Sequence, residues 1–245
     1  MKTKTFPLAL AGAALGLGLA LSGCQRAAES GFDQKIHAYL LAHPDVVEEA
    51  LQKSQDLKAA KADADARDAI RVRMDQLEHD PRDFVANPGG KVTVVEFFDY
   101  RCPYCKAALP DLMSLINQDK DVRFVFKEFP ILDNEGKPGV SKRAALAAMA
   151  SQGSGKYLQM HNAMMGTRAL DDPDIVRALR DNGIDPATAL KDTPQADKRL
   201  ADNLSLATAV GVTGTPSFEV NGKLVSGADM AALIAAISDA KKAKG

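Results

Sequence analysis

Two cysteines separated by two residues form the part of the chain best suited to chemistry, in the stretch Cys102-Pro103-Tyr104-Cys105. A β-branched and aromatic run at 92–98 precedes them and predicts a buried strand. An apolar pattern at about 103–117 follows them and predicts a helix. Cys102 then lies at the helix N-terminus, where free backbone N–H groups and the helix dipole favour a thiolate. Such a position lowers a cysteine pKa from about 8.5 to roughly 3.5–7.5, which suits redox exchange.

A zinc site and a structural disulfide are two other uses for this cysteine pair. A zinc site needs four ligands, and the sequence has neither a second cysteine pair nor histidines at a paired ligand spacing. A disulfide across four residues constrains the unfolded chain only a little. Both alternatives stay open, and redox exchange without a metal or another cofactor is the favoured interpretation.

The N-terminus has the layout of a secretory signal, because Lys2 and Lys4 precede an apolar run that ends at Leu21. The next residues complete Leu21-Ser22-Gly23-Cys24, which resembles the bacterial lipoprotein cleavage box. The resemblance implies that residues 1–23 are removed and that Cys24 carries a lipid. The alternative is an uncleaved membrane anchor, although the run is short for a span and contains several glycines. In both cases the protein body lies outside the cytoplasm, where disulfides persist, and a lipid-anchored periplasmic location is expected.

The charge of the chain gives no sign of a nucleic-acid partner. The formal net charge is −1, and it becomes −3 when Lys2 and Lys4 leave with the signal. A nucleic-acid-binding domain would instead be expected to carry a clustered excess of lysine and arginine.

Residues 24–31 are interpreted as a tether, and residues 32–80 as a helical extension with a break at His43-Pro44. Phe32, Ile36 and Leu40 fall on one face of its first helix. The alanine-rich stretch at 58–69 favours helix but has little to bury, so it is a possible pliable connector. Such an arm cannot form its own core. We expect homo-oligomerisation through residues 32–57, the alternative being a solvated spacer.

Residues 81–245 are expected to form the main domain. The strand at 92–98, the helix after it and a second strand at 122–126 predict a βαβ unit with parallel strands. A block of helices follows. Asn221-Gly222 between two apolar runs then predicts a hairpin, and a last helix is expected at about 229–241.

These residues resemble the DsbA-like branch of the thioredoxin superfamily. The resemblance rests on the stretch from Phe97 to Cys105, the helical block and Gly214-Thr215-Pro216. It implies an α/β class, a thioredoxin fold with a helical insertion at about 131–195, preceded here by an N-terminal helical oligomerisation arm. It also implies that Pro216 follows a cis bond after Thr215 and faces the cysteines. With the arm, the chain is similar to ScsC and related proteins.

Glu96 precedes Cys102 by six residues and matches the buried acidic residue of that family. Burial raises a carboxyl pKa, so Glu96 is expected to carry protons to and from Cys105. The alternative is an acid at a strand edge that faces water. Lys127 and Glu128 end the next strand, and the sequence does not tell which of them points inward. Asp99, Tyr100 and Arg101 are expected to line the rim, whereas Tyr157 and its neighbouring methionines are expected in a helix core.

The resemblance implies a thiol–disulfide oxidoreductase that acts on protein substrates through Cys102, with Pro103 and Tyr104 as the active-site dipeptide. Three interpretations follow: an isomerase or reductase kept reduced by a DsbD/ScsB-type membrane partner, a dithiol oxidase re-oxidised by a DsbB-type partner, or a non-enzymatic Cu(I)-binding copper-tolerance protein. The expected substrates are unfolded or misoxidised extracytoplasmic proteins. Tyr104 in place of the histidine of strong oxidants, and Thr215 before the proline, favour the isomerase.

Overall fold

The computed structural model describes residues 31–133 and 139–244. The predicted signal peptide, Cys24 and almost all of the tether lie outside these residues. The chain divides into two units that meet between Ala60 and Lys61. Because the relative placement of the units is not determined, each is described by itself.

The first unit is helical where it is described. Residues 31–42 are helical, the helix is broken at His43, and α2 (Pro44–Arg71) begins at the next residue. Proline tolerates the first turn of a helix and disrupts an interior, which explains the predicted break at this position. Large apolar side chains are more than half exposed here, among them Phe32, Leu41 and Leu57. In the described part of the chain, every helix is either too short or too polar to cross a membrane.

The second unit contains a five-stranded sheet in the order β1-β3-β2-β4-β5. β2 and β3 are parallel, as the predicted βαβ unit requires, and the other pairs are antiparallel. Asn221 and Gly222 have φ angles of 49° and 83°, which fit the predicted two-residue hairpin turn. The strands are β1 (Phe84–Ala86), β2 (Val92–Phe98), β3 (Val122–Glu128), β4 (Ser217–Val220) and β5 (Lys223–Ser226).

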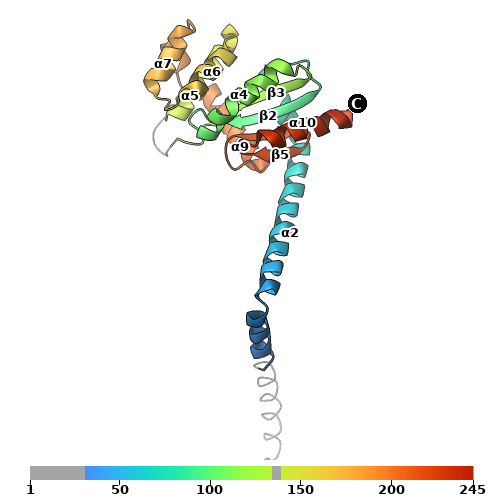
Figure 1. The fold of residues 1–245 in the computed structure, drawn as a ribbon. Coiled ribbons are helices and arrows are strands. Elements are labelled where there is room, and N and C mark those ends of the chain that lie inside the picture. The colour runs from blue at the N-terminus through green and yellow to red at the C-terminus, as the bar shows by residue number, and fades with distance from the viewer. Residues whose placement is uncertain (1–30, 134–138, 245) are drawn as a thin grey trace, which may run out of the picture. The chain divides into compact units, whose positions relative to one another are not determined.

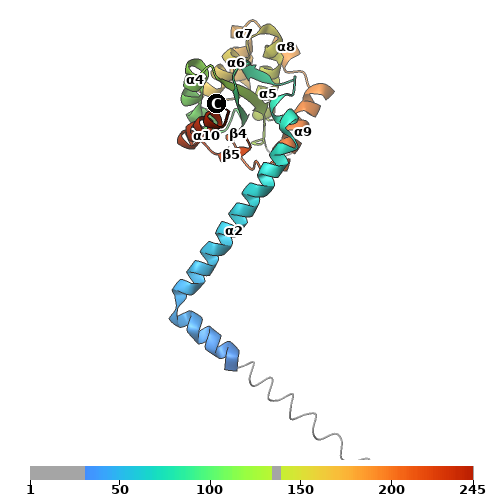
Figure 2. The same cartoon turned by 90° about the vertical axis from the view of Figure 1, so that its right-hand side faces the viewer.

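Helices cover both faces of this sheet (Figure 2). α4 and α10 pack on one face, and α3 and α9 pack on the other. The helical block between β3 and β4 begins with α5, as the sequence predicts (Figure 1). The helices are α3 (Met74–Glu78), α4 (Pro103–Gln118), α5 (Val140–Ser151), α6 (Tyr157–Gly166), α7 (Asp172–Asp181), α8 (Pro186–Ala189), α9 (Pro194–Ala209) and α10 (Met230–Lys244).

The central strand β2 is buried along its whole length and supplies both cores. Its side chains alternate between the two faces of the sheet. Val94 and Phe98 join the core under α4, α10 and the inserted helices. Val95 and Phe97 join the core under α3 and α9. The alternation places Glu96 on the same face as α4.

The second unit begins earlier in the chain than the predicted Pro81. Ile70 at the end of α2 and Leu77 in α3 are fully buried in the core under α9. The last part of the predicted arm is therefore part of the fold that carries the cysteines. A truncation at Pro81 would remove two core side chains, each worth about 2–5 kcal/mol.

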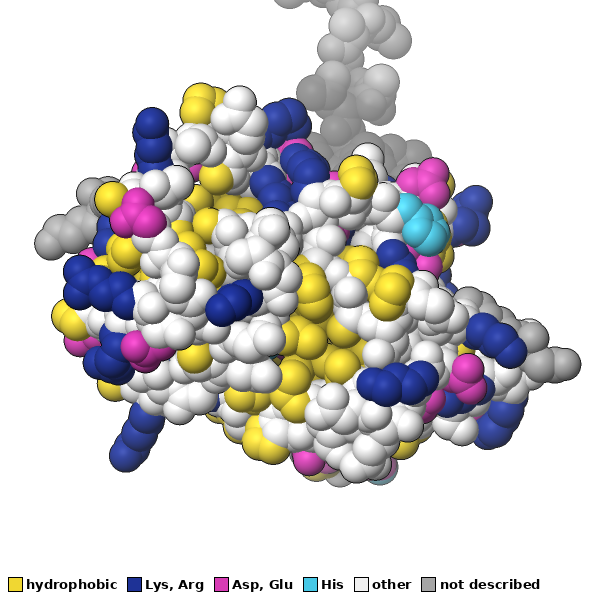
Figure 3. Space-filling view, turned by 90° about the horizontal axis from the view of Figure 1, so that it is seen from above, with side chains coloured by type: hydrophobic (Ala, Val, Ile, Leu, Met, Phe, Trp, Pro, Cys, Tyr) yellow, Lys and Arg dark blue, Asp and Glu magenta, His cyan; other side chains and the backbone are white. Residues whose placement is uncertain are grey.

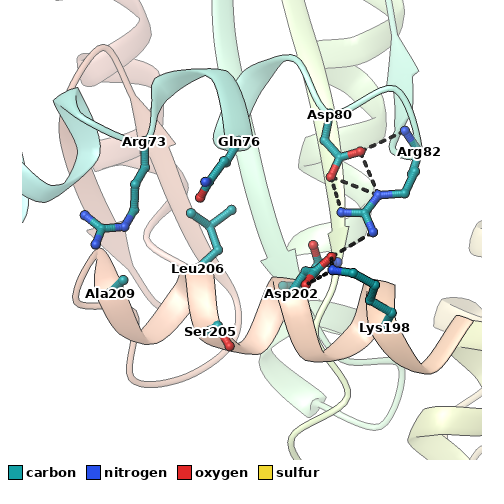
Figure 4. A pocket seen from close by; sticks show the side chains of 10 residues that line it. Arg73, Gln76, Asp80, Arg82, Lys198, Asp202, Ser205, Leu206 and Ala209 are labelled. Carbon is teal, nitrogen blue, oxygen red and sulfur yellow. Dashed lines mark hydrogen bonds and ion pairs between the residues drawn. The ribbon is translucent and has the colours of Figure 1, made fainter. Parts of the chain in front are cut away.

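A pocket of about 440 Å³ lies between α3 and α9 and is lined by charged side chains (Figure 4). Arg82 donates to both carboxylate oxygens of Asp80 and to Asp202. Lys198 donates to Asp202 from the same helix turn. These charges neutralise one another. The ion pair between Arg82 and Asp202 connects the segment before β1 to α9.

Behind this pocket, Lys127 forms a fully buried ion pair with Asp83. Its ammonium group also donates to the backbone carbonyl of Gln76 in α3. Arg199 from α9 approaches the same carboxylate at 3.4 Å. One lysine of β3 therefore connects three segments across the face opposite Glu96.

Replacing Lys127 with methionine should lower the free energy of unfolding by about 3–5 kcal/mol, because Asp83 would lose its buried partner. Lys61→Met is the matched control, since Lys61 pairs with Asp65 in water and the loss should be about 0–1 kcal/mol. Urea unfolding measures both. Equal losses in the two variants would contradict a stabilising role for the buried pair.

Candidate active site

Cys102 lies where β2 passes into α4. Its backbone is extended, with φ −69° and ψ 119°, and it occupies the N-cap position of the helix that begins at Pro103. Proline suits this first position because the N–H that it lacks would have no partner there. Cys105 lies one turn further on, and both cysteines are free and almost completely buried.

Thr215 and Pro216 approach this thiol from another part of the chain. The bond between them is cis, as the resemblance implies. β4 starts directly after them and pairs antiparallel with β2, so that Ser217 lies opposite Phe97. The Cys102 Sγ atom donates to the Thr215 carbonyl oxygen over 3.1 Å. The predicted proline loop therefore faces the first cysteine.

The two thiols have opposite acidities. The pKa of Cys102 is lowered to about 5 by a hydrogen bond from the Cys105 thiol, helped by Thr215 and by the backbone N–H groups at the start of α4. The pKa of Cys105 is raised, first by burial, then by its hydrogen bond to Cys102 and by the negative charge of Glu96. Cys102 is therefore the thiolate at neutral pH, and Cys105 keeps its proton.

Glu96 lies beneath the thiols on β2 and is only 3% exposed. Burial, followed by the negative charges of Glu128 and Cys102, raises its pKa to about 8. Its Oε2 atom has no hydrogen-bond partner among the described residues. The prediction of a buried acid is confirmed, and the alternative of a solvent-facing carboxylate is wrong.

Glu128 is a second buried carboxyl on the same face, whereas the sequence left the choice between Lys127 and Glu128 open. It is 1% exposed and accepts a hydrogen bond of 2.7 Å from the Tyr157 hydroxyl and one of 3.4 Å from Tyr100. Lys127 is also buried, but on the other face. The alternation of side chains along β3 could have predicted this, because Glu128 lies on the same face as Phe124 and Phe126.

The expectation that Asp99 and Tyr100 line the rim is wrong, since each is 1% exposed. Asp99 accepts hydrogen bonds from the Arg101 and Leu132 backbone N–H groups and from the Ser141 hydroxyl. It thus binds the turn before Cys102 to the segment after β3. The turn needs these bonds because its backbone N–H groups are out of reach of the sheet. Arg101, by contrast, is exposed as predicted.

Lys106 connects α4 to the inserted helices. Its ammonium group donates to the carbonyl oxygens of Met164, Met165 and Thr167, at 3.1, 3.4 and 2.7 Å. These carbonyls lie at the C-terminal end of α6, where the helix no longer provides N–H groups four residues further on. Tyr157, Met160, Met164 and Met165 are buried in the core, as the sequence predicts.

Comparison with known families agrees with this geometry. Residues 93–237, more than half of the chain, match the DSBA-like thioredoxin domain. Residues 29–61 match the N-terminal domain of the copper resistance protein ScsC.

Solved structures share the fold. A thioredoxin-like oxidoreductase from Silicibacter pomeroyi is 38% identical, with 69% of this chain and 97% of that chain covered and a TM-score of 0.62. ScsC of Proteus mirabilis is 26% identical, with 88% and 97% covered and a TM-score of 0.63.

Curated relatives include the Na(+)/H(+) antiporter NhaA 3 of Salinispora tropica, which is 32% identical over 164 residues. The match covers 65% of this chain and 25% of the antiporter, so the chain spans about a quarter of that relative's length. The long family match and the shared fold together lead to one assignment. The chain belongs to the DSBA-like thioredoxin family, and it carries an ScsC-type N-terminal domain ahead of the thioredoxin fold.

Proposed function

We propose that this protein exchanges disulfides with extracytoplasmic protein substrates through Cys102, and that it acts as an isomerase or reductase when it is oligomeric. The acidity difference between Cys102 and Cys105 at one helix N-terminus carries the proposal. A thiolate is the nucleophile in disulfide exchange, and the lowered pKa of Cys102 supports this role for it.

In the first step, the Cys102 thiolate attacks one sulfur of a substrate disulfide. A bond forms between Cys102 and that sulfur, while the other substrate sulfur leaves with the electron pair as a thiolate. The Thr215 carbonyl and Pro216 border the attacking sulfur, so they can position the incoming chain against Cys102.

In the second step, the mixed disulfide resolves in one of two ways. A second substrate thiolate can displace Cys102, which rearranges the substrate and regenerates the enzyme thiolate. Alternatively, Cys105 gives its proton to Glu96 and attacks Cys102, which leaves the substrate reduced and the cysteine pair oxidised. Glu96 suits this task because it is buried and has an unpartnered oxygen.

An oxidase is the second candidate, and one observation favours it. The lowered pKa of Cys102 stabilises the reduced pair at neutral pH, and a stabilised reduced form makes the disulfide a stronger oxidant. Tyr104 and Thr215 favour the isomerase on the family resemblance. The redox potential decides between the two directions.

The arm is proposed to join several copies of the catalytic unit. Its apolar side chains at Phe32, Tyr39, Leu51 and Leu57 are more than half exposed, which is costly in a monomer. Several Cys102 sites around one cleft would suit the repair of wrongly bridged chains. The 58–69 stretch could act as a pliable connector, and ScsC of Proteus mirabilis is known in compact and transitional conformations.

The proposed location is the periplasm, with a lipid on Cys24 as the membrane anchor. The redox partner is proposed to be a membrane protein of the DsbD/ScsB type for an isomerase or of the DsbB type for an oxidase. A periplasmic thioredoxin-like protein from Salmonella enterica shares the fold and is 28% identical, which supports the compartment.

The catalytic unit also has a surface suited to unfolded substrates. Hydrophobic side chains gather in the middle of the face that lies uppermost in Figure 1, with lysines and arginines around them (Figure 3). Tyr104, beside the reactive thiol, is 66% exposed. Exposed apolar groups of this kind are where unfolded chains make contact.

Cu(I) binding by Cys102 and Cys105 remains a non-enzymatic alternative, because soft thiolates suit Cu(I). The match to the copper resistance protein ScsC supports it only by its description. Over residues 31–133 and 139–244, there is no group of three or more histidine, cysteine or acidic side chains placed to hold a metal.

The thiolate absorbance of the reduced protein should appear with a midpoint near pH 5, because Cys102 ionises there. The folded-state pKa lies below the unfolded value of about 8.5. The stability gained from the thiolate is therefore complete above about 8.5 and disappears as the pH falls through about 5. Cys102→Ser should abolish the absorbance step. A midpoint close to 8.5 in the wild type would contradict an activated cysteine.

Cys105→Ser should trap a covalent adduct with scrambled ribonuclease, because the mixed disulfide at Cys102 loses its escape route. Cys102→Ser is the matched control and should trap nothing. Non-reducing electrophoresis measures the adduct. If neither variant forms one while the wild type binds Cu(I), the exchange proposal fails and the copper alternative gains support.

Removing the arm should abolish isomerase activity while leaving simple thiol exchange intact. The comparison uses lipid-free residues 25–245 and residues 61–245, because the shorter chain keeps Ile70 and Leu77 in its core. Sedimentation should show an oligomer and a monomer, respectively. Leu41→Glu places a charge on the arm and should also yield a monomer. A monomeric 25–245 chain at micromolar concentration would contradict association through the arm.

A further inference from the structure

Glu96 and Glu128 are neighbouring acids on one face of the sheet. In the parallel pairing of β2 and β3, Glu96 lies opposite Phe126 and Phe98 lies opposite Glu128, so the two acids are diagonal neighbours. They are 3% and 1% exposed, so bulk solvent screens their charges from each other only weakly. Each carboxyl group has an Oε2 atom without a hydrogen-bond partner in the described part of the chain.

The hydrogen bonds around Glu128 favour its ionised form. Tyr157 donates to Oε1 over 2.7 Å, and Tyr100 donates to the same atom over 3.4 Å. Hydrogen bonds to a carboxylate stabilise its charge. Burial outweighs these two hydrogen bonds and raises the pKa of Glu128 to about 8, so its charge develops as the pH rises toward that value.

The other groups around Glu128 act on its charge in both directions. Arg199 acts from α9 and favours ionised Glu128, whereas Asp83 opposes it. His161 of α6 lies 3.3 Å from the Tyr100 hydroxyl, but burial lowers its pKa to about 3 and keeps it neutral. Lys106 is close enough to His161 to lower that pKa further.

Burial raises the pKa of Glu96 most, and two negative charges raise it as well, those of Glu128 and the Cys102 thiolate. In a mixed disulfide the Cys102 sulfur is bonded to the substrate and carries no charge. Of the two charges that raise the pKa of Glu96, only that of Glu128 is then left. This is the stage at which Cys105 has to lose its proton.

We propose that Glu128 is a positioning residue for the escape step, whose charge keeps Glu96 basic enough to take the Cys105 proton. The inference rests on the proposed function. The Cys105 S–H bond breaks, the proton moves to a Glu96 oxygen, and the electron pair stays on sulfur. That sulfur bonds to Cys102, the bond from Cys102 to the substrate breaks, and the leaving thiolate receives the proton from Glu96. Glu128 itself neither gains nor loses a bond.

The direct test follows the carboxyl carbon of Glu96 by NMR in the lipid-free, reduced protein, with Glu96→Gln to assign the signal. Glu128→Gln should lower the Glu96 midpoint by about one pH unit, because a like-charged neighbour is lost. Glu128→Asp keeps the charge and should keep the midpoint. An unchanged midpoint in Glu128→Gln would overturn the proposal, since a purely structural role does not act on the titration of Glu96.

The kinetic test measures the rate at which a thiol peptide is released from its mixed disulfide with Cys102, as a function of pH. Glu128→Gln should lower the plateau rate several-fold and move the profile to lower pH, because Glu96 becomes a weaker base. Tyr157→Phe removes a hydrogen bond that stabilises the Glu128 charge. It should therefore change the rate and the profile in the same direction, but less strongly. It also provides a second variant should Glu128→Gln fold poorly.

The failures of the two proposals differ. A wild-type protein that forms no mixed disulfide would overturn the proposed function, while the carboxyl titration would still report on the two glutamates. Normal release by the wild type with an identical profile in Glu128→Gln and Tyr157→Phe would overturn the role of Glu128 alone.

Discussion

The pairing of β2 with its two neighbours is the constraint on which the exchange site depends. β2 ends at Phe98, four residues before Cys102, and it is buried on both faces. Its parallel partner β3 ends with Glu128, and its antiparallel partner β4 begins just after Pro216. The C-terminal end of β2 therefore brings together a thiol, a carboxyl pair and a proline loop that are far apart in the sequence.

The two faces of β3 differ in how their buried charged side chains are partnered. Lys127 pairs with Asp83, and Arg199 approaches the same carboxylate from α9, so these three charges on that face are paired. On the next residue, Glu128 is bonded to tyrosine hydroxyls and its neighbour Glu96 has an unpartnered oxygen. A paired charge stabilises the fold, whereas an unpaired carboxyl holds a proton that it can give up. β3 thus supplies a member of a structural ion pair on one face and, on the other, a neighbour of the carboxyl group that is proposed to transfer the proton.

Local patterns were enough to predict much of the fold and the centre of the site. The strand before Cys102, the helix after it and the Asn221-Gly222 hairpin are each set by neighbouring residues, so they could be read from the sequence. The roles of Asp99 and Tyr100 could not. Their burial depends on Ser141 and Tyr157, which reach them only when the inserted helices fold back.

The boundary of the catalytic unit was also hidden from the sequence, for a related reason. Ile70 and Leu77 continue a helical pattern that looks like the end of the arm, but they fill a core formed by β2 and α9. Periodicity indicates which face of a helix is apolar and not what that face covers. For Glu128 the sequence was sufficient in part. The alternation along β3 indicates which face it lies on, whereas its position beside Glu96 follows only from the strand register.

The sheet order also has a consequence for how the chain acquires its activity. β2, α4 and β3 are close in sequence, whereas β4 can pair with β2 only after the whole helical insertion has been made. Closing the longer loop costs more conformational entropy, and contacts between distant segments form more slowly. We therefore expect the two cysteines to be neighbours early in folding and the Thr215 carbonyl to arrive late. A folding chain would then have the two cysteines in contact at the start of α4 first, and the Thr215-Pro216 loop would border them only when the fold is complete.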